Sequence, residues 1–103
     1  MDGIELAVDR GSDTATLRVS GEIDLTSAPK LEEEIQSLIE QSVSTLTLDL
    51  SSVAFMDSTG LRVLLKATKL LESSGGKVVL RQPSEPVRRL LEVSGLEGHF
   101  ELS

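Results

Sequence analysis

Ser58 is the hydroxyl side chain whose setting in this sequence best suits covalent chemistry. It lies in the segment Asp57-Ser58-Thr59-Gly60, between the apolar residues 53–56 and a long amphipathic stretch. Asp57 or Ser58 is expected to cap a helix, with Gly60 allowing close packing in the first turn. A phosphate at such a helix start is stabilised by free backbone amides and by the helix dipole. The segment therefore predicts either a plain helix cap or a phosphorylation site.

Catalytic and metal-binding chemistry have little support. A serine nucleophile needs a base, and His99 is the single histidine; the GxSxG elbow and the glycine-rich phosphate loops are absent. We interpret His99 as a surface residue. Asp24, Asp49 and Asp57 could surround a divalent cation, but loop and capping carboxylates are far commoner than ligands. The chain has no cysteine, which excludes disulfides and thiolate ligands. We expect no catalytic residue, metal site or cofactor.

The composition is that of an ordinary globular protein. The chain has 103 residues and a net charge of -7, which disfavours direct contact with nucleic acid. Its aromatic residues are only Phe55 and Phe100, too few for stacking on bases. No apolar run approaches the roughly 20 residues of a membrane span, and no signal-peptide pattern opens the sequence. We expect one cytoplasmic domain over residues 1–103, without membrane insertion.

Strand and helix patterns alternate along the chain. Period-two alternation predicts a hairpin over residues 4–20 with its turn at 10–13, further strands at 46–50 and 77–81, and a short edge strand near Phe100–Leu102. Helical spacing of apolar residues predicts three helices: one after Ser27, one from about Ser58 to Ser74, and one after Ser84. Glycines at 75, 76 and 95 are expected to end the second and third of these helices. Ser27 is expected to cap its helix, and residues 51–56 to form a connection. This order predicts an α/β fold with helices packed on a mixed sheet of four to five strands.

The helix predicted after Asp57 has an unusually wide apolar arc. The main apolar stripe consists of Leu61, Leu64, Leu65, Thr68 and Leu71. Further apolar residues lie beside it: Val63, Ala67 and Leu70. The remaining arc is basic, with Arg62, Lys66 and Lys69. Such an arc is wider than a surface helix needs. The sheet and neighbouring helices could bury it all, or part of it could be an exposed binding patch. The sequence leaves both alternatives open.

The chain resembles STAS domains, the sulfate-transporter and anti-sigma-factor-antagonist family. The resemblance covers nearly the whole chain. Four segments carry the resemblance: Val19-Ser20-Gly21-Glu22-Ile23-Asp24-Leu25, Leu48-Asp49-Leu50-Ser51-Ser52-Val53, Phe55-Met56-Asp57-Ser58-Thr59-Gly60-Leu61 and Leu90-Leu91-Glu92-Val93-Ser94-Gly95-Leu96. The third segment, at 55–61, is the most specific of them.

The resemblance implies a phosphorylation-switched binding protein. Ser58, with Thr59 as its competitor, matches the serine phosphorylated by a partner that is both anti-sigma factor and serine kinase. The unphosphorylated antagonist binds this kinase and releases a sigma factor; phosphorylation prevents binding, and a metal-dependent phosphatase restores it. The chain would be a kinase substrate and not an enzyme. The residues implied to lie at the partner-binding surface are Asp24, Asp57, Ser58, Thr59, Gly60, Leu61, Arg62 and Val63.

Two alternatives remain. Many family members continue into another helix, whereas this sequence ends at Ser103. The short form also resembles the STAS subunit of phospholipid-transport ABC complexes, in which the same helix surface docks constitutively on an ATPase. Retention of the segment 57–60 favours the switched antagonist. A nucleotide-binding or hydrolytic role, proposed for some relatives, is the weaker alternative from another class.

Overall fold

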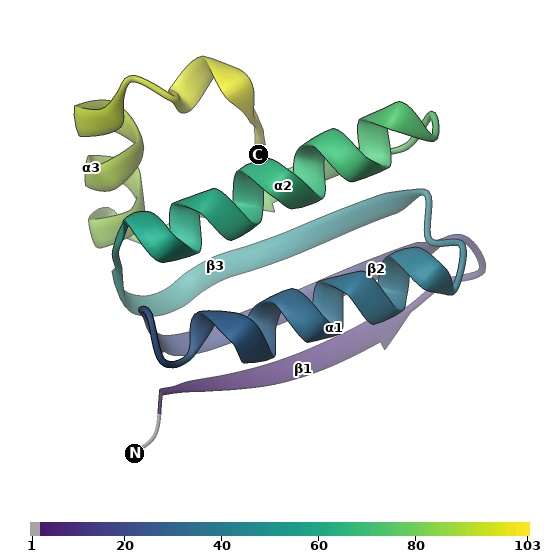
Figure 1. Ribbon diagram of the computed structural model, residues 1–103, viewed down its shortest axis with the longest axis horizontal. Helices are drawn as coiled ribbons and strands as arrows, with labels where there is room; N and C mark the ends of the chain where they lie inside the picture. The colour runs from purple at the N-terminus through teal and green to yellow at the C-terminus, as the bar shows by residue number, and fades with distance from the viewer. Residues whose placement is uncertain (1–2) are drawn as a thin grey trace.

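Five strands form one mixed sheet in the order β1-β2-β3-β4-β5. The computed structural model (Figure 1) describes residues 3–103. Strand β1 is antiparallel to β2, and β2, β3, β4 and β5 are mutually parallel. This arrangement confirms the expected α/β fold with a mixed sheet. The elements are β1 (Ile4–Arg10), β2 (Thr14–Ile23), α1 (Ala28–Glu40), β3 (Thr45–Met56), α2 (Ser58–Ser73), β4 (Lys77–Arg81), α3 (Glu85–Ser94), the 3₁₀ turn η1 (Glu97–His99) and β5 (Glu101–Leu102).

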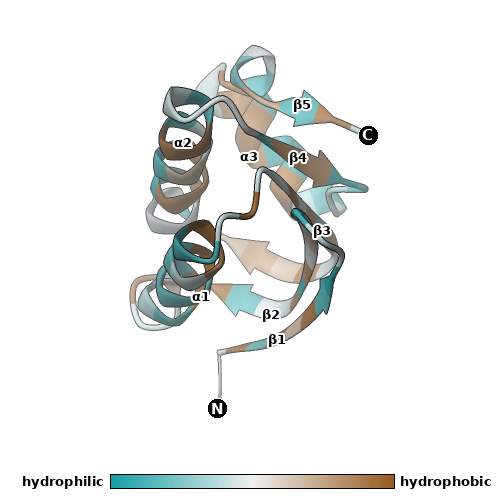
Figure 2. Ribbon diagram, turned by 90° about the vertical axis from the view of Figure 1, so that its right-hand side faces the viewer, coloured by the Kyte–Doolittle hydropathy of each residue, from teal (hydrophilic) through white to brown (hydrophobic). Residues whose placement is uncertain are grey.

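Helices α1 and α2 lie side by side on one face of the sheet, as Figure 2 shows. Each follows a strand of the parallel part of the sheet, so both helices begin at the carboxyl end of the strands, at the left of Figure 1. Helix α3 is fixed to β3 at this end, because Ser84 Oγ donates to the Val53 carbonyl at 2.6 Å. The starts of α1 and α2 therefore meet at one end of the molecule.

The core combines leucines of the parallel strands with apolar residues of all three helices. Leu17, Leu48 and Leu80 are in register across β2, β3 and β4, and none of them is exposed to solvent. Their neighbours Thr47 and Asp49 alternate with the buried leucines and are only half-buried. A slip by one residue would exchange the two sets, so this pattern fixes the register of the sheet.

Strand β3 is longer than expected. The sequence predicted a strand at 46–50 and a connection over 51–56, but β3 continues to Met56. The prediction was wrong because two exposed serines, Ser51 and Ser52, interrupt the alternation. The register of the β2–β3 pairing shifts twice in this region. Irregular pairing of this kind hides a strand from a period-two search.

Gly21 lies at the register shift nearer the site, which falls between Gly21 and Glu22. Its φ is +99°, and a Cβ added there would lie 2.3 Å from the carbonyl oxygen of Gly3. That oxygen accepts a hydrogen bond of 2.9 Å from the backbone N–H of Glu22. The start of β1 thus lies directly against β2, which an L-residue at position 21 would prevent.

Candidate functional site

The N-cap of α2 is Asp57, which settles one alternative left open by the sequence. Its Oδ1 accepts hydrogen bonds from the backbone N–H of Thr59 at 2.9 Å and of Gly60 at 3.4 Å. Ser58 is the first helical residue, and its side chain is exposed. The helix start is therefore capped without the Ser58 hydroxyl, which is left available for modification.

The first turn of α2 is held tightly against the ends of β2 and β3. The backbone N–H of Asp57 donates to the carbonyl of Ile23 at 3.1 Å. Gly60 is buried, and a Cβ built on it would lie 2.6 Å from Ile23 Cγ2 and 2.8 Å from Met56 Cγ. The absence of a side chain at Gly60 thus fixes how close Ser58 lies to the end of β2.

Replacing Gly60 with alanine should lower the free energy of unfolding. Alanine gains about 1 kcal/mol in helix propensity, but the methyl group would overlap Ile23 and Met56, and overpacking costs about 1–3 kcal/mol. We expect a net loss of about 1 kcal/mol by urea unfolding. Gly98→Ala is the control, since a Cβ there meets nothing within 4 Å. Equal stability of the two variants would contradict the tight packing described here.

The loop between β2 and α1 is organised by Asp24. Its Oδ1 accepts from the Thr26 hydroxyl at 2.8 Å, the Thr26 N–H at 3.0 Å and the Ser27 N–H at 3.1 Å. Ser27 occupies the N-cap position of α1 but its side chain caps no helical amide, contrary to expectation. The reason is competition: the Ser27 hydroxyl donates to the Glu22 carbonyl at 2.7 Å and accepts from the Asp24 N–H at 2.9 Å.

These hydrogen bonds lower the pKa of Asp24, chiefly through the Thr26 hydroxyl and then the Ser27 amide. They favour the charged carboxylate, so their contribution to loop order is complete at neutral pH and is lost as the pH falls through the lowered pKa. The amide shifts of Thr26 and Ser27 should titrate with a midpoint below the ordinary aspartate value, and the transition should vanish in Asp24→Asn. A midpoint at or above the ordinary value would contradict this assignment.

A groove lies between the N-terminal parts of α1 and α2. We call it the α1–α2 groove; residues from the loop, from α1 and from α2 line it: Leu25, Ala28, Pro29, Glu32, Thr59, Arg62, Val63 and Lys66. Three residues that the family resemblance implies at a partner surface, Thr59, Arg62 and Val63, thus line one groove beside Ser58. Gly60 and Leu61 were placed there too, but both are buried and support the surface from below.

Five groove residues were not expected at the partner surface, namely Ala28, Pro29, Glu32, Lys66 and Leu25. Leu25 is the prominent one among them. Its side chain is 73% exposed, although it belongs to a loop ordered by hydrogen bonds from its neighbours. An apolar residue directly after Asp24, where the strand pattern ends, was the available signal. The wide apolar arc of α2 is mostly buried by the fold, and Leu70, 39% exposed, is its main exposed member.

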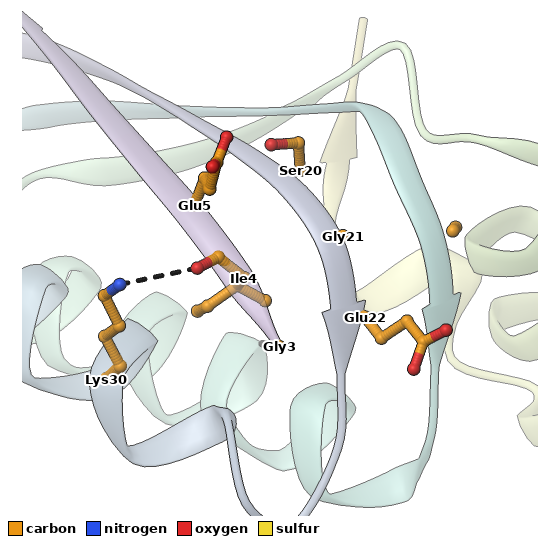
Figure 3. Close-up of a pocket in the computed structure, with 8 residues that line it drawn as sticks. Gly3, Ile4, Glu5, Ser20, Gly21, Glu22 and Lys30 are labelled. Carbon is orange, nitrogen blue, oxygen red and sulfur yellow. Dashed lines mark hydrogen bonds between the residues drawn. The ribbon is translucent and has the colours of Figure 1, made fainter. Parts of the chain in front are cut away.

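The remaining candidates lie elsewhere. His99 is exposed on η1, and Asp49 hydrogen-bonds to Ser51 on β3. Within residues 3–103, no three acidic, histidine or cysteine side chains are grouped to hold a metal ion. Figure 3 shows a hollow at the β1–β2 edge, where Lys30 Nζ donates to the Ile4 carbonyl at 3.4 Å. Its charged lining residues, Glu5, Glu22 and Lys30, present no single charge to a ligand. Over the same described residues, no helix combines the length and apolarity of a membrane span.

Known proteins resemble this chain over most of its length. The chain is 35% identical over 100 residues to the anti-sigma-B factor antagonist of Bacillus subtilis, covering 97% of this chain and 91% of the relative. It is 34% identical over 101 residues to the anti-sigma-F factor antagonist RsfB of Mycobacterium tuberculosis, covering 98% and 82%.

Solved structures show the same fold. The anti-sigma factor antagonist SpoIIAA in its unphosphorylated form superposes with a TM-score of 0.83 at 27% identity, covering 96% of this chain and 88% of that one. An antagonist from Mycobacterium paratuberculosis gives 0.87 at 32% identity, covering 97% and 85%. The sequence model for the STAS domain matches residues 5–103, and the chain therefore belongs to the STAS domain family.

Proposed function

We propose that this domain is an anti-sigma factor antagonist controlled by phosphorylation of Ser58. The observation that carries the proposal is the exposed Ser58 hydroxyl at the first position of α2, beside a carboxylate that already caps the helix. Relatives at 34–36% identity that bear the name of antagonist support it. The unphosphorylated domain would bind an anti-sigma factor in the cytoplasm and so release a sigma factor.

The partner surface that we propose is the edge where the loop after β2 meets the start of α2. Asp24, Asp57, Ser58 and Thr59 lie at this edge, and Arg62 and Val63 follow one turn further along α2. The domain contributes this surface and the hydroxyl but no catalytic group. The kinase would transfer the γ-phosphoryl group of ATP to Ser58 Oγ, releasing ADP and taking up the hydroxyl proton. A metal-dependent phosphatase would hydrolyse the ester.

The alternative, a constitutive subunit of a phospholipid-transport ABC complex, is less well supported. A subunit that docks permanently has no use for an accessible hydroxyl at the helix start, and the antagonists named above share most of their length with this chain.

Incubation with the cognate kinase and ATP should add one phosphate to this chain. Intact mass spectrometry should show a single addition, and fragmentation should place it on Ser58. The Ser58→Ala variant should remain unmodified and bind the anti-sigma factor with or without ATP. Its stability should change little, because Asp57 and not Ser58 caps α2. Thr59→Val is the control for the neighbouring hydroxyl and should still be phosphorylated. A phosphate mapped outside residues 58 and 59 would overturn the assignment.

A further inference from the structure

The α1–α2 groove has the form of a receptor for one apolar side chain. Its apolar lining comes from Leu25, Ala28 and Pro29 on one side and Val63 on the other. Polar and charged residues complete the lining: Glu32, Thr59, Arg62 and Lys66. Ala28 and Val63 are buried, whereas Leu25 is 73% exposed. Leu25 lies outside the core cluster, so its apolar surface is available to a partner.

The exposure of Leu25 is imposed by its loop. Asp24 on one side accepts four hydrogen bonds, and Thr26 and Ser27 on the other side donate them. The Ser27 hydroxyl also binds the Glu22 carbonyl. Leu25 is thus held between ordered neighbours, so little backbone conformational entropy would be lost when a partner covers it. Low ordering cost is what makes a side chain effective at an interface.

The rim of the groove carries one uncommitted positive charge. Lys66 is paired with Glu32 at 2.7 Å across the groove, whereas Arg62 is exposed and has no ion-pair partner within residues 3–103. The domain as a whole has a net charge of -7. A free guanidinium on so acidic a chain is suited to receive a carboxylate, which it binds in a bidentate manner.

We propose that the groove receives an apolar side chain of the anti-sigma factor, with an adjacent carboxylate of that partner on Arg62. The inference rests on the proposed function, and it adds Leu25 as the anchor and Arg62 as the charge that selects the partner. The groove is continuous with the phosphorylation site, because Thr59 lines its end and Ser58 is the next residue. Arg62 lies one helical turn after Ser58, at i+4. A phosphate on Ser58 would therefore compete with the partner's carboxylate for Arg62.

The test is calorimetric titration of the cognate anti-sigma factor into matched variants of the full chain. Leu25→Ser should weaken binding at least about tenfold, the size of an ordinary interface hot spot. Val93→Ser is the control: Val93 is 80% exposed but lies on α3, and its loss should leave the affinity unchanged. Arg62→Glu should weaken binding, and added salt should then strengthen the interaction, whereas salt weakens that of the wild type.

The outcomes separate this inference from the proposed function. If wild-type chain fails to bind the anti-sigma factor, the proposed function falls, and the groove's assignment with it. If wild type binds and Leu25→Ser binds equally well, only the groove's assignment is overturned. Sedimentation of the free chain tests the other occupant: a dimer that dissociates on Leu25→Ser would mean that a second copy covers the groove, and would overturn the proposal. Circular dichroism should give all three variants the wild-type fold, because the three side chains are exposed.

Discussion

Phosphorylation of Ser58 should weaken binding to the anti-sigma factor by about a hundredfold or more. A phosphoserine carries about -1.5 to -2 charges at pH 7, and here it would stand beside Asp57 and at the end of a groove proposed to receive a carboxylate. Like charges brought together at an interface cost several kcal/mol, and about 1.4 kcal/mol is a factor of ten in affinity. The effect should act on the dissociation rate as well as on the affinity.

The Ser58→Asp variant should reproduce part of this effect. Its carboxylate has less charge and fewer acceptor oxygens than a phosphate, so the loss of affinity should be smaller. Ser58→Asn is the matched control, because asparagine has nearly the same shape and no charge. Affinity that falls equally in the two variants would mean that bulk, and not charge, blocks the partner.

The domain itself should keep its fold when it is phosphorylated. The free amides and the dipole at the start of α2 stabilise a negative group there, and Asp57 already satisfies two of these amides. Amide NMR shifts should be confined to residues 57–64 and to the loop near Asp24. Shifts spread through the sheet and α3 would require a conformational switch in place of a local charge effect.

Gly21→Ala should be the most destabilising of the glycine substitutions described. An L-residue at a φ of +99° is strained, and its Cβ would lie 2.3 Å from the carbonyl oxygen of Gly3. The left-handed conformation alone costs roughly 1–2 kcal/mol, and the overlap is with backbone, which cannot rotate away. We expect a total loss of about 3 kcal/mol or more, from strain and overpacking together. Each 1 kcal/mol lowers the melting temperature of a domain this size by about 4–8 °C.

The Gly75→Ala variant separates the cost of backbone strain from the cost of steric overlap. Gly75 has a similar φ of +88°, but a Cβ there meets nothing within 4 Å. This variant should lose only the conformational part, and thermal unfolding of both variants gives the packing part by difference. If Gly21→Ala were no worse than Gly75→Ala, the contact of β1 with β2 at this point would be looser than described.

The parts of the fold that the sequence predicted correctly are those with local, regular patterns. The β1–β2 hairpin, the three helices and their terminators at Gly75 and Gly95 follow from alternation, helical spacing and turn chemistry. The end of β3 was missed because its pairing with β2 is irregular, and a bulge in one strand is set by its neighbour. The prediction that Ser27 caps α1 was wrong, because its hydroxyl hydrogen-bonds to the backbone of Glu22 and Asp24 instead. Residue preferences for the N-cap position do not account for such competing hydrogen bonds.

In the candidate site, too, local features could be predicted from the sequence and long-range ones could not. Asp57 and Ser58 are adjacent in sequence, so the sequence could limit the N-cap of α2 to one of these two residues. The α1–α2 groove could not be predicted, because Leu25 and Val63 belong to separate helix starts and meet only when β2 and β3 pair in parallel.

The parallel strands also give the molecule two unlike ends. The turn before β2, the start of β3 and the start of β4 meet at the end opposite Ser58, where Ser44 bonds to Asp13 and to Lys77. The longest dimension is 31 Å, so this far end is separated from the proposed interface by most of the molecule. Because the chain has no cysteine, Ser12→Cys would create a single thiol in that exposed turn. A fluorophore attached there would report the binding and release of a partner, by energy transfer or polarisation, without touching the surface that it monitors.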